Sequence, residues 1–565
     1  MVIRELIVAV AAFAGYVAVL AWETWPLAAR LTTHLNQVTA VATRDVPYIT
    51  WVLAWQSHAL ATDPTTILDA NIYWPARQTL FYGDPGFGAL PYFAPVFLTT
   101  GNPTLAINCL FLGGIALTAL SLHLVVRRWC GSHAAGIVAA ATLLTNPWAF
   151  RFFSWAPSYT VLFYLPWIMY LAATRTLRLR DAFWLAPLLV LQCLTNAAYV
   201  APATLVPLGV LAVARLVRPH ARRGALALAL SVTLAVVGLA PIYAGYLRTR
   251  QANVDIQAQK LAEEAAPNPE MEKVVKVVGR VARAVVSVPR RSIAKPQSTG
   301  ATLVTLLIVA AGALCAMRSS AGWRNAWAHG ALWTAMGFVL SIPAVSFFGG
   351  PVIVSPVYAL IGGALPAVDQ VIRAPDRLGL ISVVGWAVLA GVAFAACAAH
   401  IGRRVTPLLL VAVLSGLYVQ LRPHMPANYP LVRAVGGDSV VTRALREGRG
   451  PVLELPLLHD GTQFITHARA MYRSIFHWRP LLNGYSSYWP DGFRERMAVA
   501  ARVPDVEALE TLRRETRLTY VVVSLHALAP EARARWERIA AGERRDLRLV
   551  VRSFNELLFA VEPSG

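Results

Sequence analysis

Charged residues are scarce in this sequence. Asp, Glu, Lys and Arg make up 14% of its 565 residues, whereas 56% of the residues are hydrophobic. Such a chain is too apolar for an ordinary soluble multidomain protein. The composition therefore predicts a protein that lies largely in a lipid bilayer.

Cysteines are few, and several familiar catalytic motifs are missing. The five cysteines all fall within or beside apolar segments: Cys109, Cys130, Cys193, Cys315 and Cys397. This placement argues against a disulfide framework or a cysteine metal site. The region after residue 421 has no nucleophile elbow, no phosphate-binding loop and no HExxH pair. The signatures of α/β-hydrolases, P-loop enzymes and zinc peptidases are thus absent there.

Apolar segments recur along the first three quarters of the chain. A membrane-spanning helix needs about 20 predominantly apolar residues, and segments near that length predict about eleven spans. They cover residues 6–20, 105–126, 134–147, 159–173, 183–196, 200–214, 225–246, 301–317, 326–348, 378–399 and 405–421. The first lacks a small-residue cleavage site before Glu23, so we expect an uncleaved span rather than a secretory signal. Two prolines in residues 86–100 predict a broken or re-entrant segment there.

Arginines fall in alternate short loops between these segments. Examples are Arg127, Arg215 and Arg403, and the positive-inside bias predicts that their loops face the cytoplasm. This orientation places residues 28–100, residues 246–300 and everything after residue 421 outside. The formal net charge of +21 then follows from membrane orientation and requires no nucleic-acid partner.

The first outer loop is unusually rich in polar and aromatic residues between positions 44 and 85. Asp45 opens a predicted helix on which Trp51, Trp55 and His58 share one face. Aromatic rings on such a face either anchor a helix at a membrane interface or form a platform for sugars. We take Asp45 as the leading candidate for a catalytic base.

Further carboxylates of this loop stand in turn patterns. Asp63-Pro64, Asp69-Ala70-Asn71 and Asp84-Pro85-Gly86 are typical of turns and helix caps. Asp69 stands next to the aromatic pair Tyr73-Trp74. We therefore regard Asp69 as a second candidate catalytic carboxylate and Tyr73 as a candidate substrate-binding residue, with loop structure as the alternative for both.

Arginines at predicted outer ends of spans break the charge bias. Arg373 and Arg377 flank a proline just before the span at 378–399, and Arg151 lies in a predicted outer loop, 151–158. Guanidinium groups bind phosphate in a bidentate manner, so a lipid-linked phosphate is a natural partner. The alternatives are local ion pairs with Asp369 or Asp376, and a membrane-interface anchor for Arg151.

The outer segment 246–300 contains all four lysines of the protein. Asn268-Pro269-Glu270 has the pattern of a helix start, and an apolar stripe opposite basic residues follows it. A basic amphipathic helix of this kind lies flat on an anionic membrane surface. It would serve either as an anchor or as a positive collar that attracts a lipid-linked phosphate.

The sequence after residue 421 changes character and predicts a small α/β domain over residues 422–565. Residues 451–458 and 519–525 have the pattern of buried strands, and 547–561 that of a hairpin. Residues 503–515 and 530–541 are predicted helices. The predicted fold class is therefore a mainly α polytopic membrane domain, residues 1–421, followed by an extracytoplasmic α/β domain.

The chain resembles polytopic membrane glycosyltransferases of the GT-C superfamily over essentially its whole length. The resemblance rests on Asp45 at the head of the first outer loop, the run WVLAWQSHALATDP, the Asp69 to Pro75 segment, the many-span body, and the outer domain with LELP and FHWRPLLNGYS. The YfhO-like branch and uncharacterised bacterial integral membrane glycosyltransferases are the most similar groups. These motifs are loose patterns.

The resemblance implies an inverting transfer of a sugar from a polyprenyl-phosphate donor to a glycan, glycolipid or protein acceptor. The reaction would take place on the extracytoplasmic face of the bacterial inner membrane. Asp45 matches the position of the acidic residue that acts on the acceptor hydroxyl. The superfamily often pairs two acids there, but Asp45 is followed by Val46, so a divalent cation, Mg²⁺ or Mn²⁺, is left open as a cofactor.

Two other classes of function compete with this prediction. A transporter or flippase for lipid-linked glycans usually carries charges inside its spans and a repeat between its halves, and neither feature is evident in this sequence. A non-catalytic factor that binds lipid-linked glycans is the other alternative, because the acid at Asp45 is unpaired.

Overall fold

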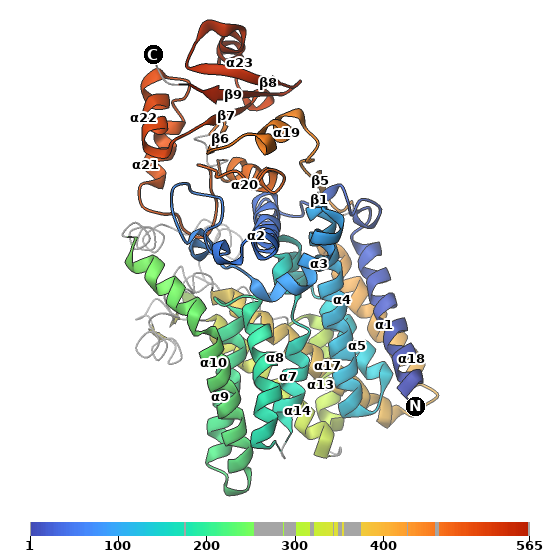
Figure 1. Cartoon of the computed structure of the whole chain (residues 1–565). Coiled ribbons are helices and arrows are strands. Elements are labelled where there is room, and N and C mark those ends of the chain that lie inside the picture. Colours follow the sequence, from blue (N-terminus) through green and yellow to red (C-terminus); the bar gives the residue numbers. More distant parts are fainter. Residues whose placement is uncertain are drawn as a thin grey trace.

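A computed structural model describes residues 2–174, 177–253, 286–287, 301–316, 321–342, 344–347, 353–354, 375–426, 428–457 and 463–562. Apolar helices run side by side at one end, and a sheet with its helices forms the other end (Figure 1). Helices α2 (Ala42–Thr62) and α3 (Leu90–Thr100) lie between these two parts. The N-terminus lies at the end of the helix bundle away from the sheet.

The helix bundle confirms the prediction of a mainly α polytopic architecture. Within the described residues, five helical segments are long and apolar enough to cross a membrane, beginning at Glu5, Pro103, Arg222, Pro375 and Thr406. The helices of the bundle are α1 (Val2–Glu23), α4 (Pro103–Cys130), α5 (His133–Leu144), α7 (Tyr164–Ala173), α8 (Ala182–Leu194), α9 (Val200–Leu216), α10 (Arg222–Gln251), α13 (Leu303–Ala316), α14 (Ala321–Ser341), α17 (Leu380–Ile401) and α18 (Thr406–Leu421). The number of spans stays a prediction.

Helix α17 forms the centre of the bundle, and the short helix η10 (Pro375–Gly379) leads into it. In the most apolar stretch of Pro375–Ile401, which comprises η10 and α17, 89% of the residues are buried. A Cβ atom added to Gly385 would lie 2.6 Å from the backbone nitrogen of Thr334 on α14. Small residues allow two helix backbones to approach this closely. Because η10 continues directly into this tightly packed helix, the packing of the helix bundle fixes the position of Arg377 on η10.

One predicted loop is helical in the structure. Residues 151–158 were expected to form a loop, but α6 (Pro147–Trp155) begins just before them. The side chain of Asn146 accepts a hydrogen bond of 2.9 Å from the backbone nitrogen of Ala149, and Pro147 occupies the first turn. The Asn-Pro pair is a helix-start signal, so the prediction of a loop was wrong for Arg151 to Trp155.

The C-terminal α/β domain has the strands that the sequence predicts. The sheet order is β6-β7-β9-β8, with β6 parallel to β7 and the other pairs antiparallel. The strands are β6 (Val452–Leu455), β7 (Tyr520–Ser524), β8 (Leu547–Arg552) and β9 (Glu556–Val561), and the helices are α19 (Val440–Glu447), α20 (Gln463–Ser474), α21 (Phe493–Ala500), α22 (Val506–Thr516) and α23 (Pro530–Arg538). The sequence pattern predicts α22 and α23 but not α19, α20 or α21.

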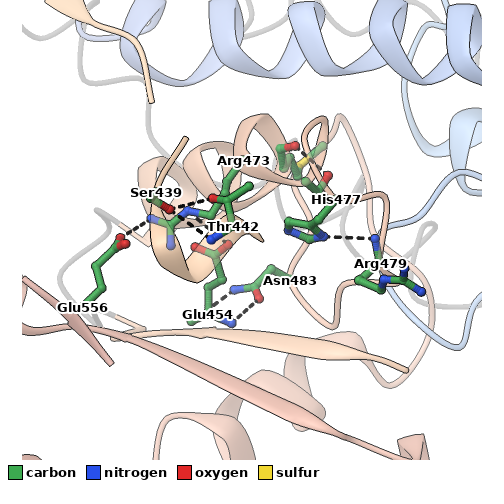
Figure 2. Close-up of polar contacts among 10 residues, drawn as sticks. Ser439, Thr442, Glu454, Arg473, His477, Arg479, Asn483 and Glu556 are labelled. Atoms are coloured by element: carbon green, nitrogen blue, oxygen red, sulfur yellow. Dashed lines mark hydrogen bonds and ion pairs between the residues drawn. The ribbon is translucent and has the colours of Figure 1, made fainter. Parts of the chain in front are cut away.

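A buried ionic group lies between this sheet and α20 (Figure 2). Arg473 of α20 is 6% exposed, and its guanidinium contacts Glu454 of β6 at 3.6 Å and Glu556 of β9 at 2.5 Å. The side chain of Asn483 forms two hydrogen bonds with the backbone of Glu454. It accepts one of 2.8 Å from the Glu454 nitrogen and donates one of 3.0 Å to the Glu454 carbonyl. These contacts tie α20 and residues 481–485 to the sheet.

The first loop and the C-terminal domain are joined through their backbones. The Tyr73 nitrogen donates to the Asn483 carbonyl at 3.1 Å, and the Trp74 nitrogen donates to the Leu481 carbonyl at 2.9 Å. Strand β1 (His34–Asn36) also pairs with β5 (Leu431–Arg433). The domain is therefore held in a fixed position over the loop that carries Asp45, and the division at residue 421 stays a prediction. The remaining short strands are β2 (Val286–Ser287), β3 (Ala344–Phe347) and β4 (Ile353–Val354).

Candidate active site

Asp45 lies where the first loop, the membrane helices and the C-terminal domain meet. It stands in the first turn of α2, and 18% of its side chain is exposed. The hydroxyl of Tyr485, from the C-terminal domain, donates a hydrogen bond of 2.6 Å to its Oδ1 atom. The Nε atom of Arg44 lies 3.7 Å from the same oxygen. A single carboxylate thus receives contacts from both halves of the chain.

The surroundings of Asp45 shift the pKa of its carboxyl group in two opposite directions. Burial raises the pKa of its carboxyl above the ordinary value, whereas the hydrogen bond from Tyr485 and the charges of Arg44 and Arg377 lower it. The net direction is upward. A general base works best with a pKa close to the pH at which the enzyme operates, so this environment suits proton abstraction from a hydroxyl group.

Arg377 faces the same region from the membrane side. Its guanidinium carbon lies 5.0 Å from the ring centre of Trp155 on α6 and 5.0 Å from that of Tyr199, which precedes α9. None of the ion pairs found among the described residues involves Arg377. Aromatic rings hold its planar group in a fixed orientation. The hydroxyl of Tyr159 and the carboxylates of Asp376 and Asp45 interact with its charge. Arg373 and Asp369 lie outside the described residues.

Asp84 is a second carboxylate of this region. Its oxygens accept hydrogen bonds from the backbone nitrogens of Gly86 at 2.9 Å and Ala198 at 3.2 Å. Burial raises the pKa of Asp84 to about 6, although these hydrogen bonds and the charge of Arg377 lower it. The sequence shows only a turn at this position. Asp84 and Ala198 are 114 residues apart in the sequence, so no local signal could have predicted their contact.

Asp69 has its own partners within the loop. Its carboxylate pairs with Arg77 at 3.2 Å and accepts a hydrogen bond of 2.7 Å from the backbone nitrogen of Gln78. These contacts hold the loop where Gln78 adopts a positive φ of 53°. They give Asp69 a structural role, and its predicted catalytic role is untested.

The predicted aromatic face of α2 points into the protein interior. Trp51 is 1% exposed and its indole donates to Asn71 at 3.0 Å, while Tyr73 is fully buried and donates to the Tyr488 carbonyl at 3.1 Å. Trp55 is 8% exposed. Both indoles pack between the loop and the C-terminal domain, so this face forms neither a membrane-interface anchor nor an exposed platform for sugars. The substrate-binding roles of Trp51, Trp55 and Tyr73 stay predictions.

His58 belongs to a different part of the surface. Its ring stacks on Trp478 with 4.1 Å between ring centres, at the far end of α2 from Asp45. Both residues line an apolar pocket of about 390 Å³ together with Ala61, Phe97, Leu98, Gly101, Arg446, Ile475 and Phe476. Arg151 is exposed on α6. The charges of Asp45 and Arg377 thus interact in the structure, and His58 lies elsewhere.

Comparison with known proteins gives matches among solved structures only. No protein-family profile and no curated protein matches the chain. The structure of ArnT from Cupriavidus metallidurans bound to undecaprenyl phosphate matches with 13% identity and a TM-score of 0.48, over 100% of this chain and 98% of that one. ArnT in the apo state matches with 14% identity and a TM-score of 0.49, over 97% of each chain.

A third match is the arabinofuranosyltransferase AftD from Mycobacteria. It has 14% identity and a TM-score of 0.49, over 98% of this chain and 40% of that one. Because all three TM-scores are below 0.5, the reaction proposed below rests on the residues of this chain.

The side chains of the site offer few ligands for a metal ion. Among the residues that the structure describes, no group of three or more His, Cys, Asp or Glu side chains could hold one. Divalent cations such as Mg²⁺ take several oxygen ligands, and the site offers the carboxylates of Asp45 and Asp84. No step of the mechanism below uses a cation.

Proposed function

We propose that the protein is an inverting glycosyltransferase that moves a sugar from a polyprenyl-phosphate donor to a hydroxyl group of an acceptor. The acceptor would be a glycan, glycolipid or protein at the extracytoplasmic face of the bacterial inner membrane. The observation that carries this proposal is that a largely buried carboxylate, Asp45, and an aromatic-held guanidinium, Arg377, lie close enough for their charges to interact, at one end of an apolar helix bundle.

The two groups would divide the chemistry. Asp45 takes the proton of the acceptor hydroxyl as the acceptor oxygen forms its bond to the anomeric carbon. The bond between that carbon and the phosphate oxygen breaks on the opposite side, and the lipid phosphate leaves with the electron pair. Arg377 stabilises the charge that develops on this phosphate. Its place on η10, just before α17, suits a leaving group that is anchored in the bilayer.

Donor consumption would test the proposal. The full chain, purified and reconstituted in lipid vesicles, is incubated with a panel of polyprenyl-phosphate sugars and a cell-envelope extract that supplies acceptor hydroxyl groups. The incubation is run with and without a chelator, beside the Asp45→Asn variant. We expect the wild type to consume one donor and to release polyprenyl phosphate, and the variant to be inactive. Binding of a donor without consumption would contradict the proposal in favour of a binding factor. Movement of an intact donor across the bilayer would identify a flippase.

Arg377→Gln should weaken the use of the donor. Loss of the charge is expected to lower kcat/KM for the donor by about 100-fold, in the range for removal of one transition-state donor group. Arg377→Lys should recover only part of it, because an ammonium group lacks the planar fork and the ring stacking. Steady-state kinetics on the donor identified above would measure both variants.

The matched control is Arg128→Gln. The guanidinium of Arg128 also packs on an aromatic ring, 4.8 Å from the centre of Trp167, but it lies in the last turn of α4, at the other end of the bundle. Its loss should leave kcat/KM unchanged. Equal losses in the Arg128 and Arg377 variants would mean that Arg377 acts through folding alone.

A further inference from the structure

The C-terminal domain reaches directly into the candidate active site through Tyr485. Its hydroxyl donates to the Oδ1 atom of Asp45 at 2.6 Å, across 440 residues of sequence. Asp45 stands on α2 and Tyr485 belongs to the C-terminal domain, so this hydrogen bond connects the two parts of the fold. A soluble domain that only bound glycans would not need to contact this carboxylate.

The ring of Tyr485 is held on several sides. Tyr48 of α2 meets it edge-on at 5.5 Å, and Phe464 of α20 lies 5.7 Å away. The guanidinium of Arg44 lies 5.8 Å from the ring centre. The backbone nitrogen of Tyr485 donates to the sulfur of Met471 at 3.2 Å. The hydroxyl therefore has a defined direction, set by packing that a phenylalanine at this position would keep.

We propose that Tyr485 is the positioning residue of Asp45, which it holds by Oδ1 so that Oδ2 faces the hydroxyl group of the acceptor. The inference rests on the proposed function of Asp45 as the base. A base that is oriented by a third group is a recurring arrangement in enzymes that activate hydroxyl groups. Since Tyr485 belongs to the C-terminal domain, that domain completes the active site.

The hydrogen bond also affects the charge of Asp45. It stabilises the ionised carboxylate and so lowers its pKa, against the upward effect of burial. The other groups that face Asp45 are Arg44, Arg377 and Tyr48, and Asp84 acts on the same Tyr48. All of these remain in a Tyr485→Phe protein. Any change in the titration of Asp45 in that protein would therefore come from the lost hydroxyl.

The test compares pH profiles of sugar transfer by the full chain in vesicles. In Tyr485→Phe the Asp45 pKa should rise, so the acidic limb of kcat should move upward by about one pH unit. At pH 7 kcat should fall about tenfold from misorientation of the base, whereas KM for the donor should not change. A 3-fluorotyrosine at position 485 keeps the packing and donates more strongly, so the limb should move downward.

Tyr472→Phe is the matched control. Tyr472 is also buried, and its hydroxyl bonds Thr104 of α4 at 2.6 Å. Its removal deletes a similar contact between the C-terminal domain and the membrane domain, but away from Asp45. We expect a comparable shift in the unfolding midpoint and an unchanged pH profile.

The possible results separate this inference from the proposed function. If Asp45→Asn is inactive while Tyr485→Phe and the fluorotyrosine protein keep the wild-type profile, Tyr485 is not the positioning residue and the proposed function stands. If Asp45→Asn remains active, the proposed function itself fails. If the Tyr472 variant shows the same pH shift, the effect comes from docking of the domain and the inference is wrong.

Discussion

Replacing Asp45 with asparagine is expected to lower kcat for sugar transfer by about 100- to 10,000-fold at pH 7, the range for loss of a general base. Asparagine has nearly the same shape, and its amide oxygen can still accept the hydrogen bond from Tyr485. It cannot take a proton from the acceptor. Donor binding should persist, since Arg377 and its flanking rings are unchanged. Single-turnover assays with saturating donor would separate the chemical step from binding.

Asp63→Asn provides the control in the same loop. Asp63 is exposed at the end of α2, and its side chain accepts a hydrogen bond of 3.1 Å from the Thr65 nitrogen. Asparagine caps helices as well as aspartate does, so activity and folding should match the wild type. Activity of Asp45→Asn within threefold of the wild type would rule out Asp45 as the base. Asp84→Asn and Asp69→Asn would then be the next variants to assay.

The pH profile of the wild type should show the environment of Asp45. Burial raises the pKa of this carboxyl, and only the ionised form can act as a base. Activity should therefore fall as the pH drops through a pKa above the ordinary aspartate value of about 3.9. In Arg44→Gln, which removes a charge that lowers this pKa, the acidic limb should lie at higher pH still.

The sequence predicts those features of the fold that depend on local pattern. Apolar segments long enough to span a bilayer identify the helices of the bundle, and the runs at 451–458 and 519–525 identify β6 and β7. Helix α20 was missed, because its buried face includes His467 and Arg473, whose charge and polarity break the apolar period. Those side chains are buried only because tertiary partners satisfy them, and no periodic pattern records such partners.

In the candidate site, too, the sequence indicates only what depends on local pattern. Asp45 and Arg377 could be selected from sequence, since an acid at the head of an outer loop and an arginine at the wrong end of a span are both local exceptions. Tyr485 could not, because its hydrogen bond to Asp45 depends on how the C-terminal domain docks. The sequence offered two interpretations of Trp51, a membrane-interface anchor and a platform for sugars. Neither predicts its burial, since an aromatic helix face has the same spacing at a membrane interface and in a protein interior.

Arg473→Met should destabilise the C-terminal domain strongly. Arg473 neutralises two carboxylates, Glu454 and Glu556, in the interior between α20 and the sheet. Removing one partner of a buried ion pair typically costs about 3–5 kcal/mol, because a buried charge is left without compensation. Pulse proteolysis of the full chain in increasing urea would measure the loss. Arg513→Met removes a surface pair with Glu510, at 2.8 Å, and should leave the free energy of unfolding almost unchanged, because water screens such a pair.

The loss of stability in Arg473→Met should also depend on pH, and whether it grows or shrinks as the pH rises identifies its cause. Burial and the charge of Glu556 raise the pKa of Glu454, and the positive charge of Arg473 lowers it. Without Arg473 the pKa of folded Glu454 lies further above its value in the unfolded chain, so a proton binds more tightly to the folded state. The variant should then lose stability as the pH rises through that pKa. We expect a larger loss at pH 8 than at pH 5. A loss that is equal at both values would mean that missing packing of the arginine side chain, rather than the unpaired carboxylates, destabilises the domain.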